Sequence, residues 1–390
     1  MFFCHIELYK QMKIGIVCYP TFGGSGVVAT ELGLGLADKG HDVHFITYKR
    51  PVRLTAFHPN VYFHEVTAME YPLFEYAPYE TALASKIVDV VRFEKLDILH
   101  VHYAIPHAAV AYMTKEILKT HGIRLPVVTT LHGTDITLVG TDASFSPVVA
   151  FSINASDGVT AVSEQLKKET LSTFKIVKDI RVIYNFIDFS RFRKTNKDHF
   201  RKAIAPDGEK ILVHISNFRK VKRVQDVIHI FEKIKKEVNA KLLLIGDGPE
   251  RKHMEDLCRS LHLCEEIRFL GKQEAVEELL AIADLFILPS ENESFGLAAL
   301  EAMACEVPVI SSNAGGLPEV NIDGVTGYMC DIGDVASMAE KSISLLKDEE
   351  SLNVFRRNAF LQAKRFDITE ILPQYESYYL EIIEQVKSES

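Results

Sequence analysis

Short runs of apolar residues alternate along nearly the whole chain with longer stretches in which apolar positions recur every three or four residues. Short continuous runs are typical of buried strands, whereas the three-or-four spacing indicates amphipathic helices. Strands are therefore predicted at Lys13–Tyr19, Val43–Thr47, Val61–Val66, Ile98–His102, Val127–Leu131, Gly158–Val162, Ile211–Ile215, Lys241–Ile245, Ile267–Leu270, Leu285–Leu288, Val307–Ser311 and Gly327–Cys330. Helices are predicted, among others, at Val27–Lys39, Ala82–Glu94, Val224–Glu237, Pro249–Leu261, Ala275–Ala283, Phe295–Ala304 and Glu370–Gln385.

Apolar strands separated by helices indicate parallel βαβ units with helices on both faces of the sheet. A polar, charged stretch at residues 188–210 divides the strands into two series, which predicts an α/β protein with two doubly wound domains. We place the first domain at residues 1–187 and the second at 188–369, with residues 370–390 able to pack back on the first. Ligands bind at the carboxyl ends of the strands in such sheets, so the cleft between the domains is the expected site. Residues 1–11 lie outside the pattern and are expected to be a dispensable extension.

The composition is that of an ordinary globular protein, with 47% apolar and 25% charged residues among 390. No apolar run approaches the ~20 residues of a membrane-spanning helix, so stable membrane insertion is not expected. The net charge of −9 argues against nonspecific nucleic-acid binding, which requires a basic face. Six cysteines without a CxxC pair fit neither a disulfide framework nor a zinc knuckle, and a reducing cytoplasm is the expected location.

A glycine-rich turn, Gly23-Gly24-Ser25-Gly26, joins the first predicted strand to the first predicted helix. Glycines allow a positive φ or a close backbone approach, and the N–H groups of a helix start attract anions. The turn also fits the loose G-x-G-x-x-A fingerprint of a dinucleotide-binding dehydrogenase. That class needs an acid after the second strand to hold a ribose, where this sequence has Lys49-Arg50. A basic residue at this position could bind the 2′-phosphate of NADP, so an NADP-dependent enzyme stays open. A loop that binds an anion or a polar substrate is favoured.

Two glutamates separated by seven residues, Glu293 and Glu301, follow a predicted strand of the second series. A carboxylate accepts two hydroxyl groups at once, which suits a vicinal diol such as a ribose. The N–H groups at Phe295–Leu297 would form a helix start suited to a phosphate or sugar oxygen. Glu301 lies within the apolar stretch Leu297–Cys305, where an acid is costly to bury without a partner. A ligand role is therefore favoured over a solvated surface position.

A basic cluster, Arg219-Lys220-Val221-Lys222-Arg223, follows the first strand of the second series. Cations at the carboxyl end of a strand would stabilise a diphosphate leaving group, and a solvated basic face is the alternative. Glycine turns follow two later strands, in GDGPE at 246–250 and NAGGLPE at 313–319. The sequence contains no D-x-D motif that could hold a metal ion beside a diphosphate. The basic cluster is therefore expected to take the place of a metal ion, and no cofactor is expected.

Three histidines lie close together in the first domain, at His100, His102 and His107. The H-x-H spacing on a strand points two rings to one face and could hold a metal. No nearby acid or cysteine completes a ligand set, so core or cleft-lining histidines are the favoured interpretation.

Together, the E-x7-E element, the basic cluster and the GDGPE and GGLPE turns resemble the retaining glycosyltransferases of family 4. The resemblance covers residues 12–390 and implies the GT-B architecture, two Rossmann-like doubly wound parallel-sheet domains with an interdomain cleft. The stretches CYPTFGGSG, HYAIPHA, TTLHGTDIT, YNFID, SNFRKVKRVQDVI and SENESFGLAALEAMAC resemble most closely the members that begin bacillithiol synthesis. This implies UDP-GlcNAc as the donor, L-malate as the acceptor, retention of the α-configuration and transfer without a metal.

For the donor, the resemblance implies that Glu301 binds the ribose hydroxyls, Lys222 neutralises the diphosphate and Glu293 contacts the sugar. Most members place an arginine five residues before this lysine; Asn217 stands there in this chain, and Arg219 is the candidate substitute. The other donor-binding residues that the resemblance implies are Gly246, Phe269, Leu270, Phe295, Gly296 and Leu297.

In the first domain, His132 matches the family histidine near the sugar C6 hydroxyl and joins Lys222 and Glu293 as a catalytic candidate. An acceptor with two carboxylates needs N–H groups, hydroxyls or cations. The candidates for this role are Gly23, Gly24, Ser25, Gly26, Tyr103, Arg53, and Thr129 or Thr130. Lys49 and Arg50 are further candidate charges, and the sequence does not choose among them.

Three other functions stay open from the sequence: a family 4 transferase with a glycan or lipid-linked acceptor, an NADP-dependent oxidoreductase, and a nucleotide-sugar sensor without catalysis. A homodimer is an open expectation, because dimers are the commonest assemblies.

Overall fold

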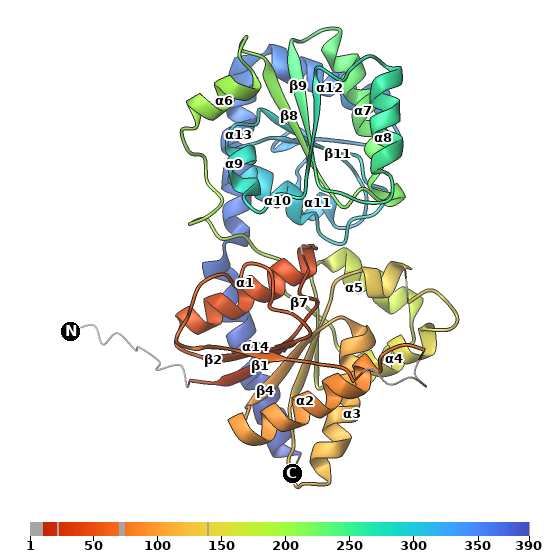
Figure 1. The fold of residues 1–390 in the computed structure, drawn as a ribbon, viewed down its shortest axis with the longest axis vertical. Helices are drawn as coiled ribbons and strands as arrows, with labels where there is room; N and C mark the ends of the chain where they lie inside the picture. The colour runs from red at the N-terminus through yellow and green to blue at the C-terminus, as the bar shows by residue number, and fades with distance from the viewer. Residues whose placement is uncertain (1–10, 22, 70–74, 139, 390) are drawn as a thin grey trace, which may run out of the picture. The chain divides into compact units, whose positions relative to one another are not determined.

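The computed structural model describes residues 11–21, 23–69, 75–138 and 140–389. Residues 1–10 of the expected N-terminal extension lie outside the described residues. Contacts divide the chain into two compact units (Figure 1). Within the described residues, the first unit contains the chain up to Val162, Lys167–Ile183 and the chain from Leu372 onward; the second contains Ser163–Leu166 and Tyr184–Ile371.

The first unit is built on a parallel sheet with the order β3-β2-β1-β4-β5-β6-β7. Its strands are β1 (Lys13–Val17), β2 (Asp42–Thr47), β3 (Val61–Glu65), β4 (Ile98–His102), β5 (Val127–Leu131), β6 (Gly158–Ala161) and β7 (Arg181–Val182). Its helices are α1 (Gly24–Asp38), α2 (Tyr79–Glu94), α3 (Ala109–Lys119), α4 (Ser146–Ala155) and α5 (Glu164–Thr173), with single turns η1 (Ala104–Ala108) and η2 (Thr134–Leu138). The long helix α14 (Ile368–Ser388) joins this unit from Leu372 onward.

Helices cover both faces of the first sheet, as continuous apolar strands require. On one face, Ile46, Leu99 and Val101 pack with Ile87 of α2 and Val110 of α3 in a single hydrophobic core. On the other face lie α1 and α14 (Figure 1).

The second unit has a parallel sheet with the order β10-β9-β8-β11-β12-β13. Its strands are β8 (Lys210–Ile215), β9 (Ala240–Ile245), β10 (Ile267–Gly271), β11 (Leu285–Leu288), β12 (Val309–Ser312) and β13 (Gly327–Cys330). Its helices are α6 (Asp198–Ile204), α7 (Val224–Lys235), α8 (Arg251–Ser260), α9 (Val276–Ala281), α10 (Leu297–Ala304), α11 (Leu317–Val320), α12 (Val335–Lys347) and α13 (Glu349–Ala363), with single turns η3 (Lys220–Lys222) and η4 (Lys364–Phe366). Phe231, Leu242 and Ile287 belong to its core.

The predicted α/β fold with two doubly wound sheets is confirmed, and each predicted strand is present with ends shifted by at most two residues. The two-residue strand β7 was not predicted, because so short an edge strand has no periodicity. Helix starts were predicted less accurately. Helices α1 and α2 begin at Gly24 and Tyr79, each three residues before the predicted start. Helix α10 begins at Leu297, two residues after the predicted start, because the left-handed φ of 96° at Gly296 excludes an earlier one.

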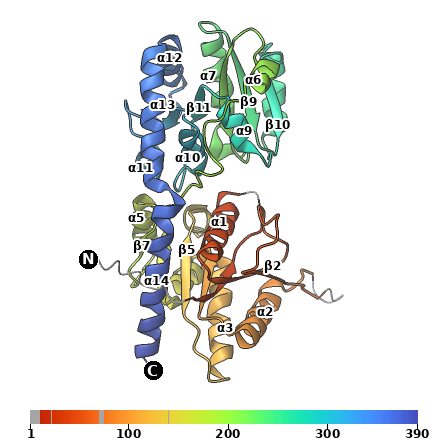
Figure 2. The ribbon, with the colours of Figure 1, turned by 90° about the vertical axis from the view of Figure 1, so that its left-hand side faces the viewer.

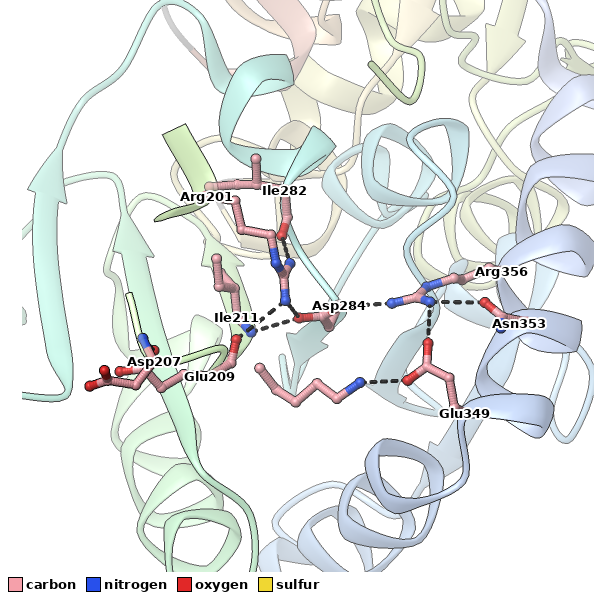
Figure 3. A network of polar contacts seen from close by, with 10 residues as sticks. Arg201, Asp207, Glu209, Ile211, Ile282, Asp284, Glu349, Asn353 and Arg356 are labelled. Carbon is pink, nitrogen blue, oxygen red and sulfur yellow. Dashed lines mark hydrogen bonds and ion pairs between the residues drawn. The ribbon is translucent and has the colours of Figure 1, made fainter. Parts of the chain in front are cut away.

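A buried carboxylate holds the amino edge of the second sheet. Asp284, just before β11, accepts bonds from Arg201 of α6 at 2.7 Å, from the backbone N–H of Ile211 in β8 at 2.8 Å and from Arg356 of α13 at 2.7 Å (Figure 3). One carboxylate therefore joins two helices to two strands, and the two guanidinium groups supply the charge that its burial requires.

Helix α14 is fixed to the first unit by buried polar side chains on one of its faces (Figure 2 shows this helix leading to the C-terminus). Glu376 is 1% exposed and accepts bonds from His41 Nε2 at 2.9 Å and from Lys39 Nζ. Tyr379 bonds His100 Nδ1 at 2.7 Å, and the Tyr378 hydroxyl accepts the N–H of Val159. Among the described helices, including α14, none combines the length and apolarity needed to cross a membrane.

Replacing Glu376 with glutamine should destabilise the protein by about 3 kcal/mol, because it removes the charged partner of a buried cluster. Burial opposes the charged form, but the bonds from His41 and Lys39 outweigh it and hold the pKa of the Glu376 carboxyl below its ordinary value. Such a group stabilises the fold above the ordinary carboxyl pKa and stops doing so as the pH falls through the lowered value. The difference between wild type and Glu376→Gln in urea denaturation should therefore shrink in acid.

Glu384→Gln is the matched control, because Glu384 lies exposed on the same helix. Equal losses of stability in the two variants would contradict a specific role for Glu376.

Candidate active site

Each sheet has one position where the strand order reverses, between β1 and β4 in the first unit and between β8 and β11 in the second. The connections after these neighbouring strands run to opposite faces of the sheet, which leaves an opening at the carboxyl edge where ligands bind. Most of the site residues predicted from the sequence lie in the loops or in the first helical turns at these two positions.

In the first unit, a side-chain contact crosses this position. The Tyr103 hydroxyl, after β4, donates to Ser25 Oγ, after β1, at 2.7 Å. Gly23 precedes α1 in an extended conformation, and Gly24 and Ser25 begin the helix itself. Gly26 is required for close approach rather than for a positive φ: a Cβ there would lie 2.4 Å from the carbonyl oxygen of Tyr19.

His132 lies beside this contact and is held by a second histidine. His102 Nδ1 and His132 Nε2 are 2.8 Å apart, and the rings of His132 and Tyr103 are 5.1 Å apart. Asp135 fixes the surrounding backbone, since its two oxygens accept the N–H groups of Ala104 at 2.8 Å and Gly133 at 3.0 Å. Burial raises the pKa of the Asp135 carboxyl to about 6, against the effect of these backbone bonds.

The protonation of the two bonded histidines follows from their environment. Burial lowers the pKa of His132 to about 3 and lowers that of His102 well below its ordinary value, so both rings are neutral at pH 7. His102 Nε2 is buried with no partner in the described part of the chain. A bare nitrogen is less costly there than a buried N–H, so His102 carries its proton on Nδ1 and donates it to His132. The His132 proton is then on Nδ1, which makes that nitrogen a donor.

Three other acceptor candidates of the first unit have side chains that are already bonded within the protein. Thr129 and Thr130 are fully buried, with hydroxyls bonded to Ser156 at 2.7 Å and Thr160 at 2.6 Å, which disfavours them as acceptor ligands. Arg53 has a φ of 73° and pairs with Glu31 at 2.9 Å, so its charge is already balanced.

The buried histidines match the interpretation preferred from the sequence. His100 bonds Tyr379 and Thr130, and His107 Nδ1 donates to the carbonyl of His102. These contacts account for the H-x-H pair through core bonding.

In the second unit, an ion pair crosses the corresponding position. Lys222, after β8, lies 2.6 Å from Glu293, after β11, and the same carboxylate oxygen accepts the Ser290 hydroxyl at 2.9 Å. The side chains of Lys222 and Glu293 are 19% and 14% exposed, so a ligand at this edge can reach both. Two further contacts join the loops: Arg223 pairs with Glu291 at 2.7 Å, and the Glu291 N–H donates to the Val221 carbonyl at 2.8 Å.

Glycines bring a third loop against Glu293. Gly315 has a φ of 55°, and a Cβ on it would lie 2.1 Å from the Glu293 carbonyl oxygen, which also accepts the Gly316 N–H at 2.7 Å. A Cβ on Gly296 would lie 2.6 Å from the Leu317 side chain. The glycine pattern of this segment is therefore needed for close packing around the E-x7-E element.

Helix α10 begins directly behind this contact, at Leu297. The first N–H groups of a helix have no acceptor within it, so they can bind an anion. Glu301 lies one turn further along the helix and is 7% exposed. The Phe295 ring packs in the core against Phe366, 5.4 Å between centroids, so only its backbone can serve a ligand.

The remaining donor candidates lie along the same edge. Asn217 and Arg219 are exposed, and no bond or ion pair of the Arg219 guanidinium occurs among the described residues. Gly246, with a φ of 122°, donates its N–H to the Gly271 carbonyl. The register of β10 shifts between Phe269 and Gly271, which leaves Leu270 outside the regular pairing.

Three residues of these networks were missed as site residues: Asp135, Ser290 and Glu291. Asp135 and Ser290 follow β5 and β11 within a few residues. Their position just after a predicted strand could have identified them as site candidates. Glu291 belongs to the same loop, but its pairing with Arg223 depends on the distance between two loops, for which the sequence has no signal.

Comparison with known proteins gives the class. Residues 22–191 match Glycosyltransferase Family 4, and residues 195–362 match the family Glycosyl transferases group 1. The chain belongs to these glycosyltransferases, and its two Rossmann-like sheets are those of the GT-B fold. It is 52% identical, over 97% of its length and 99% of the relative, to the N-acetyl-alpha-D-glucosaminyl L-malate synthase of Bacillus anthracis.

Two solved structures share the fold at low identity. Sucrose-phosphate synthase from Thermosynechococcus elongatus has a TM-score of 0.80 at 20% identity, with 96% of this chain and 100% of that chain covered. The Anabaena protein HepE, solved with UDP and glucose, has a TM-score of 0.80 at 21% identity, with 94% and 99% covered.

We expect His102→Leu to lower the kcat/KM of glycosyl transfer about fivefold, because His132 loses the bond that fixes its proton, worth about 1 kcal/mol. His102→Asn should restore most of the activity, since the asparagine amide can donate from nearly the same place. Steady-state kinetics at several pH values measure the effect. Equal activity of the two variants, at unchanged melting temperature, would refute a role for His102 in orienting His132.

Proposed function

We propose that this protein transfers GlcNAc from UDP-GlcNAc to the hydroxyl of L-malate, with retention of the α-configuration and release of UDP. The observation that supports this most is the 52% identity, over nearly the full length of both chains, to the Bacillus anthracis synthase. The ion pair and helix start at the switch position of the second sheet are consistent with a nucleotide-sugar donor. We place the reaction in the cytoplasm.

The donor is assigned to the second unit. In this proposal, Glu301 accepts the two ribose hydroxyls, and the N–H groups at the start of α10 bind a phosphate oxygen. Lys222 and the exposed Arg219 supply positive charge for the diphosphate, Arg219 standing in for the arginine that Asn217 replaces. The irregular backbone at Phe269 and Leu270 faces the uracil.

The acceptor is assigned to the first unit. The first turn of α1 offers the N–H groups of Gly24 and Ser25 to a carboxylate of malate, while the Gly26 N–H is bonded to the Gly23 carbonyl. Tyr103 and Ser25, already bonded to each other, supply hydroxyls beside that turn. Arg53 pairs with Glu31, so the exposed Lys49 and Arg50 are the better candidates for the second carboxylate.

The Lys222–Glu293 pair determines how the donor would enter. The diphosphate carries more negative charge than a single carboxylate, so Lys222 exchanges Glu293 for the phosphate when the donor binds. Glu293 then becomes available to accept hydroxyl groups of the sugar. The bond from the sugar C1 to the phosphate oxygen breaks as the bond to the malate oxygen forms on the same face. The malate proton passes to the departing phosphate, and Lys222 stabilises the charge that develops there. These cations take the place of a metal ion.

The proposal is tested by incubating the purified protein with UDP-GlcNAc and, separately, L-malate, other hydroxy acids, free sugars and a lipid-linked sugar. We expect UDP release and an α-linked GlcNAc-malate product by mass spectrometry and NMR with L-malate, also after treatment with a chelator. Turnover only with a sugar or lipid acceptor would replace malate as the acceptor; binding without turnover would indicate a sensor.

Lys222→Ala should lower kcat about 10²–10³-fold, since it removes a group that stabilises charge on the leaving phosphate. Lys220→Ala is the matched control, because Lys220 lies in the same turn and is exposed. Single-turnover rates at saturating donor separate the chemical step from binding. A Lys222→Ala rate close to that of the control would rule out this role.

A further inference from the structure

A second polar cluster lies in the first unit, apart from the loops described above. It consists of His44 on β2, His64 on the edge strand β3 and Glu94, the last residue of α2. The register pairs His44 with Tyr62 and Ile46 with His64, so the two rings lie on the same sheet face, two positions apart. Ile46 packs in the core shared with α2, which shows that α2 covers this face. Three separate segments therefore contribute one side chain each.

The donor atoms of these side chains converge. His44 Nδ1 and His64 Nε2 are 3.0 Å apart, and a nitrogen from each ring and a carboxylate oxygen of Glu94 all lie within 4.8 Å of one another. The two rings stack with centroids 5.2 Å apart, and Tyr62 stacks on His44 at 4.6 Å. The geometry of the imidazoles is thus fixed by the sheet and by aromatic packing before any ligand arrives.

The chemical state of the rings suits a metal. Burial lowers the pKa of His44 to about 4 and lowers that of His64, so both are neutral at pH 7 and each ring has one nitrogen lone pair. His44 is 1% exposed, and its Nε2 has no partner in the described part of the chain.

We propose that His44, His64 and Glu94 bind a divalent transition metal, with Zn²⁺ as the best fit. Two imidazoles and one carboxylate form a ligand set found in zinc sites, with water in the fourth position. Nitrogens at about 2.0–2.1 Å from a tetrahedral zinc lie roughly 3.3 Å apart, a few tenths of an ångström more than the present separation. Ca²⁺ and Mg²⁺ prefer oxygen ligands and fit poorly.

The position of the cluster indicates a structural ion that is separate from the transfer reaction. Glu94 ends a helix that runs from the carboxyl edge of β3 back to the amino edge of β4, so the cluster lies away from the Tyr103–Ser25 contact. An ion there would join the edge strand β3 to β2 and α2. Lys13 and Lys86 also lie near these rings and lower their pKa values through charge repulsion, so affinity should be moderate.

The test uses the full-length protein, stripped with a chelator and titrated with Zn²⁺ against a chromogenic chelator, and with Co²⁺ followed by visible absorption. We expect one ion per chain, an intense tetrahedral Co²⁺ spectrum and a higher melting temperature with zinc. His64→Gln and Glu94→Gln should each weaken binding at least tenfold. His58→Gln is the control, since His58 is a histidine of the same unit paired with Asp38 outside the cluster.

The wild type failing to bind, or His64→Gln binding as tightly as His58→Gln, would overturn the proposal. His64→Gln and Glu94→Gln change partly exposed side chains, and the folding of each variant is checked by circular dichroism before titration. Transfer activity is measured in parallel with and without the chelator. Retained activity together with a lower melting temperature supports a structural ion, whereas loss of activity on chelation, restored by zinc, would overturn the separation of this ion from the reaction.

Discussion

The structure depends on the reversal of strand order beside the first strand of each parallel sheet. Because β2 and β4 lie on opposite sides of β1, the loops after β1 and β4 diverge toward opposite faces; β8 and β11 repeat this arrangement. Side chains cross these positions, as a tyrosine–serine bond in the first unit and a lysine–glutamate pair in the second. In the second unit, a backbone bond from Glu291 to Val221 crosses as well. The polar groups at the two edges are thus a consequence of the topology.

Charged groups away from these positions have a different role. They lie at the amino edge of the second sheet and on the face of the first sheet that α14 covers. Asp284 and Glu376 are almost fully buried, and each is held by two cationic or imidazole partners. These carboxylates join helices to sheets and have no capacity left for a ligand. Lys222 and Glu293 retain 19% and 14% exposure at the carboxyl edge. Because exposure weakens their mutual attraction, the pair can exchange partners, whereas the buried clusters cannot.

The sequence was sufficient to predict the sheets, because buried parallel strands have continuous apolar runs and the helices between them have a distinct period. It was also sufficient to place most of the candidate residues at the carboxyl edges of the sheets, since that edge follows from chain direction. It could not predict which hydroxyls are free: Thr129 and Thr130 lie near the end of a strand beside the site, but their bonds to Ser156 and Thr160 depend on the neighbouring segments. The pairing of Arg53 with Glu31 depends likewise on a loop folding back onto α1. Local pattern specifies elements, while side-chain availability depends on partners distant in sequence.

The ion pair at the second switch position also bears on how a diphosphate can be bound tightly and still released. A lysine alone at this edge would be strongly hydrated, and a ligand would have to displace that water. A lysine already paired with Glu293 exchanges one anion for another, so much of its desolvation and ordering cost is met before the ligand arrives. In the proposed reaction, Glu293 would compete again for Lys222 after the transfer, which would favour loss of the nucleotide product. The Ser290 hydroxyl keeps Glu293 in place during this exchange, since it bonds the same carboxylate oxygen. In the proposed reaction, three side chains on two loops therefore serve both the binding of the donor and the release of the nucleotide product.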